Sequence, residues 1–147
     1  MEHRIIRTRI DATEVVTLKN PPANALDLKM VEDCVEALQS IGADESVRSM
    51  VLTAEGKTFC AGLDLKAVPG YQREEQDRLL EALNKLFFGL YQCPVPVVGA
   101  INGHAIAGGL VAALCCDWRI AAQTPLPPSA SACAMASCDE LRPMRNT

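Results

Sequence analysis

The hydrophobic and polar positions at the start of the chain follow the pattern of two β-strands. Residues Ile5–Ile10 alternate apolar and polar side chains after the first step, and Val15–Leu18 form a second short run. A polar break at residues 11–14 separates the runs. Alternation of this kind indicates half-buried strands, and two such runs joined by a short polar segment indicate a hairpin. The pattern predicts that the chain opens as a β-hairpin.

Two longer stretches repeat apolar residues at helical spacing. The first follows Asp27, a residue type that favours the N-cap, and is predicted to end at Gly42. Its apolar stripe consists of Val31, Cys34, Val35, Leu38 and Ile41. The second stripe consists of Leu79, Leu80, Leu83, Leu86, Phe87 and Leu90. Each stripe predicts an amphipathic helix that buries one face.

Three more strands are predicted at Met50–Leu52, Val95–Ile101 and Trp118–Ala121, and a third helix is predicted to begin near Gly108. The first two strands are continuous apolar runs, which are typical of strands buried on both faces. Strands that alternate with helices indicate an α/β layered fold with crossover helices.

The composition of the chain changes at about residue 123. Residues 123–147 contain four of the nine prolines and no Val, Ile, Phe, Tyr or Trp. A segment of this kind contributes little to a hydrophobic core. We therefore expect residues 1–122 to fold as one unit and residues 123–147 to form an atypical, disordered tail.

Composition and charge narrow the functional class. The formal net charge of −4 and the six aromatic residues do not suit binding to nucleic acid. The seven cysteines contain no C-x-x-C pair, which indicates neither a zinc site nor a disulfide framework. No secretory signal is visible at the N-terminus. We expect a cytoplasmic protein in a reducing compartment, with a mitochondrial or peroxisomal location left open.

One uncharged window, from Cys93 to Cys116, has the length of a membrane span if His104 is neutral. Pro94, Pro96 and the turn sequence Asn102-Gly103 interrupt any helical period in it. The window therefore indicates a buried strand, a turn and a helix, and we expect no association with membranes.

Two loops carry the candidate chemistry. One is Phe59–Leu65, which follows a buried strand, and the other is Asn102–Gly109, where a strand ends and two glycines begin a helix. Glycine turns and helix starts leave backbone N–H groups free for a ligand. Two such donors together would form an oxyanion hole. The alternative interpretation is that both loops are tight packing turns.

The motifs at residues 59–66 and 102–109, with a long helix between them, resemble the two oxyanion-hole motifs of the enoyl-CoA hydratase/isomerase (crotonase) family. The segment 20–26 is also similar to that family. The resemblance runs from about Ile5 to Ala122. It implies a spiral of β-β-α units, here truncated and followed by a non-matching tail. It also implies trimeric or hexameric assembly and an acyl-CoA thioester substrate. No metal or redox cofactor is implied.

By the same resemblance, the backbone N–H groups of Leu63 and Gly108 are the oxyanion donors that stabilise a thioester enolate. The other residues expected at the substrate, either near CoA or beside the donors, are Cys60, Ala61, Lys66, Gly109 and Val111. Two side chains in the first loop also have plainer interpretations. Asp64 is expected to bond neighbouring backbone amides, and Cys60 lacks a partner base and is expected to pack in the core.

The acid and base residues depart from the family pattern. Hydratases of the family have a glutamate where this chain has Val111, which favours an isomerase-like proton transfer over hydration. The single remaining carboxylate of the family falls near Ser131, inside the tail, and has no counterpart there. An inactive fragment that binds acyl-CoA or partner subunits is therefore the main alternative. An unrelated nucleotide-binding α/β domain is a third hypothesis. A partial subunit should also leave apolar surface exposed, which predicts assembly or aggregation.

Overall fold

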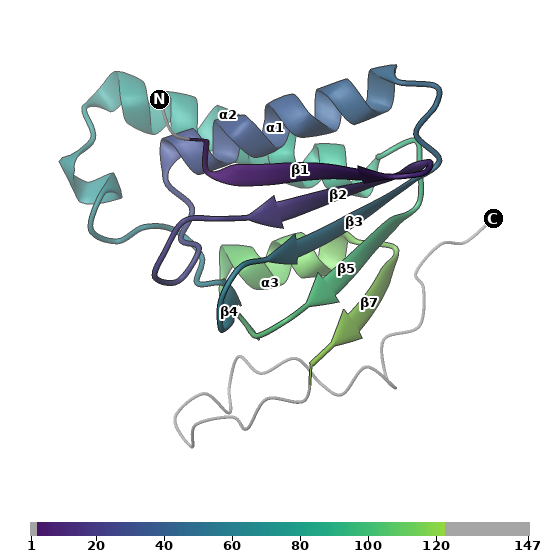
Figure 1. Cartoon of the computed structure of the whole chain (residues 1–147). Helices are drawn as coiled ribbons and strands as arrows, with labels where there is room; N and C mark the ends of the chain where they lie inside the picture. Colours follow the sequence, from purple (N-terminus) through teal and green to yellow (C-terminus); the bar gives the residue numbers. More distant parts are fainter. Residues whose placement is uncertain (1–2, 123–147) are drawn as a thin grey trace.

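The computed structural model describes residues 3–122, and Figure 1 shows how their strands and helices are arranged. The predicted tail, residues 123–147, lies outside the described residues. A five-stranded sheet has the strand order β1-β2-β3-β5-β7, and a separate two-stranded sheet pairs β4 with β6. The described part of the chain therefore has the mixed α/β architecture that the alternation of strands and helices predicts.

The predicted hairpin is confirmed. Strands β1 (Ile5–Ile10) and β2 (Thr13–Leu18) are antiparallel, with Ile5 opposite Leu18. β2 begins two residues before the apolar run, because Glu14 continues the strand as a buried residue. Its carboxylate accepts a hydrogen bond of 2.8 Å from Nε of Arg7. A buried carboxylate is tolerated when it has such a partner, so a polar residue occupies a covered position of the strand.

The remaining strands of the large sheet, β3 (Ser49–Ala54), β5 (Val97–Ile101) and β7 (Trp118–Ala121), run parallel to β2. Three helices make the crossovers between them: α1 (Leu28–Ala43), α2 (Arg73–Tyr91) and α3 (Gly108–Cys115). Parallel strands need such crossovers because the end of one strand and the start of the next lie at opposite edges of the sheet. The crossover prediction is therefore confirmed.

Helices α1 and α2 follow the predicted stripes with two differences. Asp27 caps α1 as expected, since its carboxylate accepts a 2.7 Å hydrogen bond from Met30 N–H, but the helix continues through Gly42. In α2, Leu79, Leu86 and Leu90 are buried, whereas Leu80 is 61% exposed. Leu80 follows Leu79 by one residue, and neighbouring helical positions differ by about 100°, so both cannot face the core.

Two short strands and one turn of 3-10 helix were not predicted from the sequence pattern. They are β4 (Thr58–Cys60), β6 (His104–Ala105) and the 3-10 turn at Val68–Gly70. Segments of two or three residues are too short to show alternation. The sequence therefore predicted loops where the two strands of the small sheet lie.

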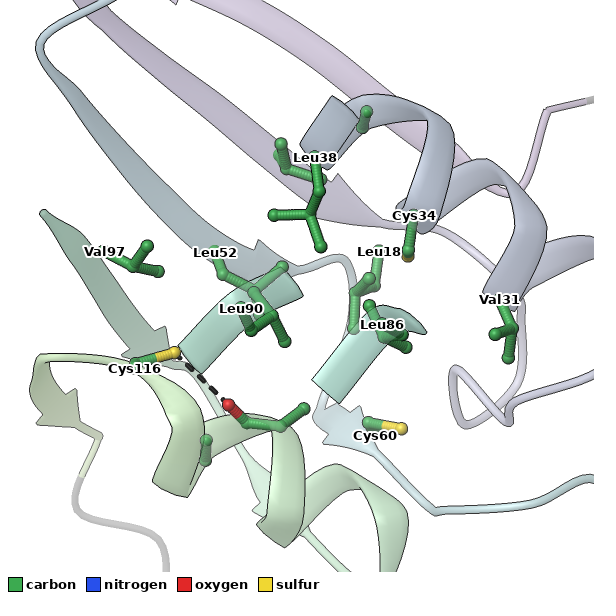
Figure 2. Close-up of a cluster of buried hydrophobic side chains, with 14 of the residues drawn as sticks. Leu18, Val31, Cys34, Leu38, Leu52, Cys60, Leu86, Leu90, Val97 and Cys116 are labelled. Carbon is green, nitrogen blue, oxygen red and sulfur yellow. Dashed lines mark hydrogen bonds between the residues drawn. The ribbon is translucent and has the colours of Figure 1, made fainter. Parts of the chain in front are cut away.

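The hydrophobic core lies between the large sheet and the helices. Figure 2 shows side chains from the sheet, α1 and α2 together in this core, among them Leu18, Leu38, Leu52 and Leu90. Residues on β2 and β3 alternate between buried and partly buried positions, so one face of the sheet is covered better than the other.

The less covered face carries apolar side chains. Val98 of β5 lies opposite Trp118 of β7, and Ala100 lies opposite Ile120. Trp118 is 62% exposed and Ile120 is 67% exposed. The expected exposure of apolar surface is thus present on the last strand of the sheet, while assembly through it stays a prediction.

The uncharged window Cys93–Cys116 divides into β5, β6 and α3. In the described part of the chain, no helix is both long enough and apolar enough to cross a membrane.

We predict that Asp27→Ala lowers the free energy of unfolding by about 1 kcal/mol, because the first turn of α1 loses its side-chain acceptor. Urea denaturation measures the change. Asp27→Asn is the matched control, since asparagine caps helices about as well as aspartate. An equal loss in both variants would show that the cap hydrogen bond is not the cause.

Candidate active site

The small sheet brings the two loops of interest together. β4 and β6 pair in parallel, with Thr58 opposite His104 and Cys60 opposite Ala105. The Ile106 N–H extends the pairing by donating a 2.9 Å hydrogen bond to the Cys60 carbonyl. Because parallel strands end at the same edge, the segments that follow β4 and β6 leave the sheet side by side. Residues more than 40 positions apart in the sequence thus form one local structure.

Gly62 makes the close approach of these two segments possible. Its φ of +84° is a backbone conformation that residues with a side chain rarely adopt. A Cβ atom at Gly62 would lie 2.9 Å from Cβ of Ala107 and 3.2 Å from the backbone nitrogen of Gly108. The first loop therefore passes directly against the start of α3.

The turn before α3 is itself strained. Ala107 has a φ of +48°, which costs an alanine about 1–3 kcal/mol. Two hydrogen bonds hold the turn: Gly109 N–H donates to the Ile106 carbonyl at 2.8 Å, and Val111 N–H donates to the Ala107 carbonyl at 3.0 Å. Strain that the surroundings maintain in this way is common at functional sites.

Two backbone N–H groups at this junction have no protein acceptor. Within residues 3–122, neither the Leu63 N–H nor the Gly108 N–H donates a hydrogen bond. Leu26 bridges Leu63 in parallel, since Leu26 N–H donates to the Gly62 carbonyl at 2.7 Å and the Leu26 carbonyl accepts from Asp64 N–H at 3.0 Å. In this arrangement the Leu63 N–H points away from Leu26.

The Gly108 N–H is free for a different reason. Gly108 is the first residue of α3, where no intrahelical acceptor exists and the helix dipole is positive. The junction therefore presents two amides from adjacent loops that can donate to the same kind of ligand, an oxygen that carries negative charge.

The residues expected at the substrate divide into surface and interior positions. Leu63 is 39% exposed, Val111 is 42% exposed, and Lys66 is exposed. Gly108 and Ala61 are half-buried, and the Ala61 N–H donates to the Ala23 carbonyl at 3.1 Å. Cys60 and Gly109 are buried. Leu63, Gly108 and Gly109 thus meet at one junction, while their contacts with a substrate stay predictions.

Cys60 lies in the interior as a packing residue, and its side chain is 1% exposed. Burial raises the pKa of its thiol to about 11, and the pKa of the neighbouring Cys34 to about 12. A protonated, buried thiol is a poor nucleophile. The thiol of Cys60 therefore does not reach a ligand at the surface.

Asp64 serves the backbone of its own loop. Its carboxylate accepts hydrogen bonds from the N–H groups of Lys66 at 2.8 Å and Ala67 at 3.0 Å. These bonds, with that from Lys66 the strongest influence, hold the pKa of the carboxyl below its usual range. The plainer interpretation of Asp64 is confirmed. Among the described residues, no cluster of three or more His, Cys, Asp or Glu side chains could hold a metal ion.

Asn24 is a residue that the sequence analysis did not single out. It is 2% exposed, and its side chain makes three hydrogen bonds to backbone groups around the first loop. The available signal was an asparagine within a segment that resembles the family. Its burial and its partners are visible only in the tertiary structure.

Comparison with known proteins establishes the family. The family model for enoyl-CoA hydratase/isomerase matches residues 9–131. The chain belongs to the enoyl-CoA hydratase/isomerase family, as the motifs in its two loops indicate. The match continues past the boundary predicted at residue 122, into the part of the chain that lies outside the described residues.

Relatives with different activities are equally similar to the chain. A probable enoyl-CoA hydratase of Bacillus subtilis is 38% identical over 110 residues, which are 74% of this chain and 43% of that protein. Human mitochondrial enoyl-CoA delta isomerase 1 is 38% identical over 112 residues, which are 76% of this chain and 37% of the isomerase. The chain spans less than half the length of these two relatives. Sequence identity therefore does not choose between hydratase and isomerase.

Solved structures show the same fold. The crystal structure of human mitochondrial Δ3-Δ2-enoyl-CoA isomerase matches with a TM-score of 0.74 and 34% identity, over 79% of this chain and 46% of that chain. An enoyl-CoA hydratase from Bacillus anthracis matches with a TM-score of 0.75 and 33% identity, over 80% of this chain and 47% of that chain. The described residues thus share a crotonase-like fold with about half of each of these two solved chains.

We predict that Gly109→Ala destabilises the protein. Alanine is usually better than glycine in a helix by about 1 kcal/mol. Here, however, the new Cβ would overlap the Cys60 backbone, and overpacking of this kind typically costs about 1–3 kcal/mol. Thermal denaturation should show a lower Tm. Gly70→Ala is the control, because no atom lies within 4 Å of the Cβ position at Gly70. A Tm for Gly109→Ala at or above the original value would contradict the close packing of the two loops.

We also predict that the Cys60 thiol of the folded protein resists alkylation by iodoacetamide at pH 8. With a pKa of about 11, only about one thiol in a thousand is ionised at that pH, compared with about one in ten at the ordinary value of 9.0. Reactivity should rise as the pH approaches 11. Peptide mapping follows each cysteine, and half-buried Cys115 should react before Cys60. Rapid labelling of Cys60 without urea would show that its thiol is accessible.

Proposed function

We propose that the chain binds an acyl-CoA thioester whose carbonyl oxygen accepts hydrogen bonds from the N–H groups of Leu63 and Gly108. The observation that supports this function is the pair of amides at the junction of β4 and β6 that have no acceptor within residues 3–122. When the α-proton leaves the thioester, negative charge develops on that oxygen and an enolate forms. The two amides would stabilise this charge more than they stabilise the neutral thioester.

The stabilisation relies on donors that are in place before the substrate arrives. The strained turn at Ala107 and the close contact at Gly62 fix the two amides relative to each other. The start of α3 adds a partial positive charge beside Gly108. Loss of one such donor in other enzymes typically reduces the rate by about 10²–10³-fold. This chemistry uses backbone groups and the thioester, and it requires no metal or redox cofactor.

The exposed residues around the junction suggest how the rest of the substrate would lie. Lys66 follows the first loop and can offer its ammonium group to a phosphate of CoA. Val111 lies one turn into α3 and presents an apolar, exposed side chain that suits the acyl part. These contacts belong to the proposal, together with trimeric or hexameric assembly in a reducing compartment.

Isomerase-like chemistry is the reaction that the residues favour. In that reaction a base takes a proton from C2 of a 3-enoyl thioester and returns it to C4, so the double bond moves into conjugation. Val111 occupies the position of a hydratase glutamate and cannot transfer a proton. We propose that a carboxylate on a partner chain performs this step.

A second function is favoured by one observation. Asp64, the carboxylate within the first loop, is engaged by two backbone amides and does not act as a free base. A chain that contains the donors without a base would bind acyl-CoA thioesters, or associate with family subunits, without turnover. Binding and turnover therefore have to be measured separately.

The test replaces the Leu63 amide by an ester, which removes one N–H group and keeps the side chain. Calorimetry with acetoacetyl-CoA should show saturable binding to the unmodified chain. The ester should weaken this binding by up to about tenfold, as expected for the loss of one hydrogen bond to a neutral carbonyl oxygen, and leave the affinity for CoA itself unchanged. The same ester at Leu65 is the matched control, because Leu65 also lies in this loop and is 80% exposed.

The outcomes separate the two functions. Turnover of a 3-enoyl-CoA by the full chain supports the isomerase, and binding without turnover supports the fragment. Absence of saturable binding to acetoacetyl-CoA would overturn thioester binding in both functions and leave only association with family subunits. Equal weakening by the esters at Leu63 and Leu65 would show that the Leu63 N–H has no special role.

A further inference from the structure

One buried side chain lies at the centre of the segment that supports the first loop. Asn24 adopts a φ of +50°, which asparagine tolerates better than most residues, and it is 2% exposed. Its Oδ1 accepts a 2.8 Å hydrogen bond from Asn20 N–H. Its Nδ2 donates to the carbonyls of Glu55 at 2.9 Å and Thr58 at 2.7 Å. A carboxamide can make these bonds because it has an acceptor and two donors.

The partners of Asn24 show what the side chain holds. Glu55 comes directly after β3, and Thr58 is the first residue of β4. The two donated bonds therefore fix both ends of the connection that leads into the small sheet. The hydrogen bond that Asn24 accepts from Asn20 N–H ties this connection to the residues that follow β2. Asn24 thus joins the entry of β4 to the end of the hairpin strand β2.

The backbone around Asn24 continues the support into the loop. The Ala23 carbonyl accepts from Ala61 N–H at 3.1 Å. Leu26 bonds on both sides of Leu63, through the Gly62 carbonyl and the Asp64 N–H. This pairing is what turns the Leu63 N–H outward. The residues next to Asn24 in the sequence therefore hold, through backbone hydrogen bonds, the loop that contains the Leu63 N–H.

The same segment also contacts the second donor. A Cβ atom added at Gly108 would lie only 3.0 Å from Cδ1 of Leu26, so the Leu26 side chain packs close to Gly108. A displacement of residues 23–26 would move the support of both amides together. Asn24 itself is too deeply buried to touch a ligand at the junction.

We propose that Asn24 is a positioning residue that holds the Leu63 and Gly108 amides in the arrangement that binds a thioester oxygen. The inference rests on the proposed function, because it takes the binding of a thioester oxygen as the task for which Asn24 positions the two amides. It predicts that loss of the Asn24 side chain weakens recognition of the thioester carbonyl more than recognition of CoA. A residue that only stabilised the fold would affect both ligands alike.

The test compares Asn24→Gly with Thr53→Val in the full chain. Glycine keeps the positive φ accessible and removes only the side-chain hydrogen bonds. Thr53→Val removes a side-chain bond of 2.9 Å to the Ala100 carbonyl, between β3 and β5 of the large sheet, and is the matched control for lost stability. Circular dichroism first establishes that both variants are folded at the temperature of measurement.

For Asn24→Gly, the affinity for acetoacetyl-CoA should fall by about tenfold or more while the affinity for CoA changes less than about twofold, since small displacements of positioned groups have large effects. The absorbance of a bound conjugated thioester, such as cinnamoyl-CoA, should lose part of its red shift because the carbonyl is less polarised. Thr53→Val should change neither the ratio of the affinities for acetoacetyl-CoA and CoA nor the spectrum of bound cinnamoyl-CoA. Retention of the original affinity and red shift in Asn24→Gly would overturn the proposal.

A measurement without ligand distinguishes a failure of the inference from a failure of the proposed function. In amide NMR spectra, Asn24→Gly should shift the Leu63 and Gly108 resonances, and Thr53→Val should leave them in place. If the unmodified chain binds no thioester, the proposed function fails while this measurement still tests the positioning. If Asn24→Gly unfolds the chain, Asn24→Asp repeats both measurements, since it keeps the shape and removes the two donors. Unchanged Leu63 and Gly108 resonances in the folded variant would also overturn the inference.

Discussion

The rest of the site depends on a contact between two backbones with no room for a side chain. A Cβ atom at Gly103 would overlap the Lys57 carbonyl, and a Cβ atom at Gly109 would overlap the Cys60 carbonyl. A Cβ atom at Gly62 would lie 3.2 Å from the backbone nitrogen of Gly108, so Gly62 also packs closely against the start of α3. These glycines let β4 and β6 pair tightly, and the pairing places two loops from distant parts of the chain at one edge. The free amides at that edge follow from this geometry.

Buried polar side chains act with this contact to hold the surrounding segments. Asn24 fixes the entry to β4, and at the edge of the large sheet Asp33 accepts a 2.8 Å hydrogen bond from Arg4 N–H and pairs with Lys29. Each of these buried groups has partners, which offsets the cost of removing it from water. Asn24 therefore holds segments next to the ends of β2, β3 and β4, and Asp33 holds the residue that precedes β1.

The described half of a crotonase-like fold contains the donors of the proposed site, while one face of the large sheet stays partly uncovered. Trp118 and Ile120 on β7 are the most exposed apolar residues of that sheet. In the proposed function, binding of a thioester would use the junction of β4 and β6, whereas proton transfer would also use a positioned carboxylate. This division explains why recognition and turnover are separate questions for this chain.

The sequence by itself determined the hairpin, the three helices, the parallel strands and the two candidate loops, because amphipathic periods and glycine turns are local properties. It placed the end of α1 too early at Gly42, included Leu80 in a buried stripe, and missed β4 and β6, since these details depend on packing. Only the tertiary structure decided that Asn24 supports the first loop and that the Leu63 and Gly108 amides have no acceptor among residues 3–122. Those properties arise from contacts between residues far apart in the chain, which no local pattern records.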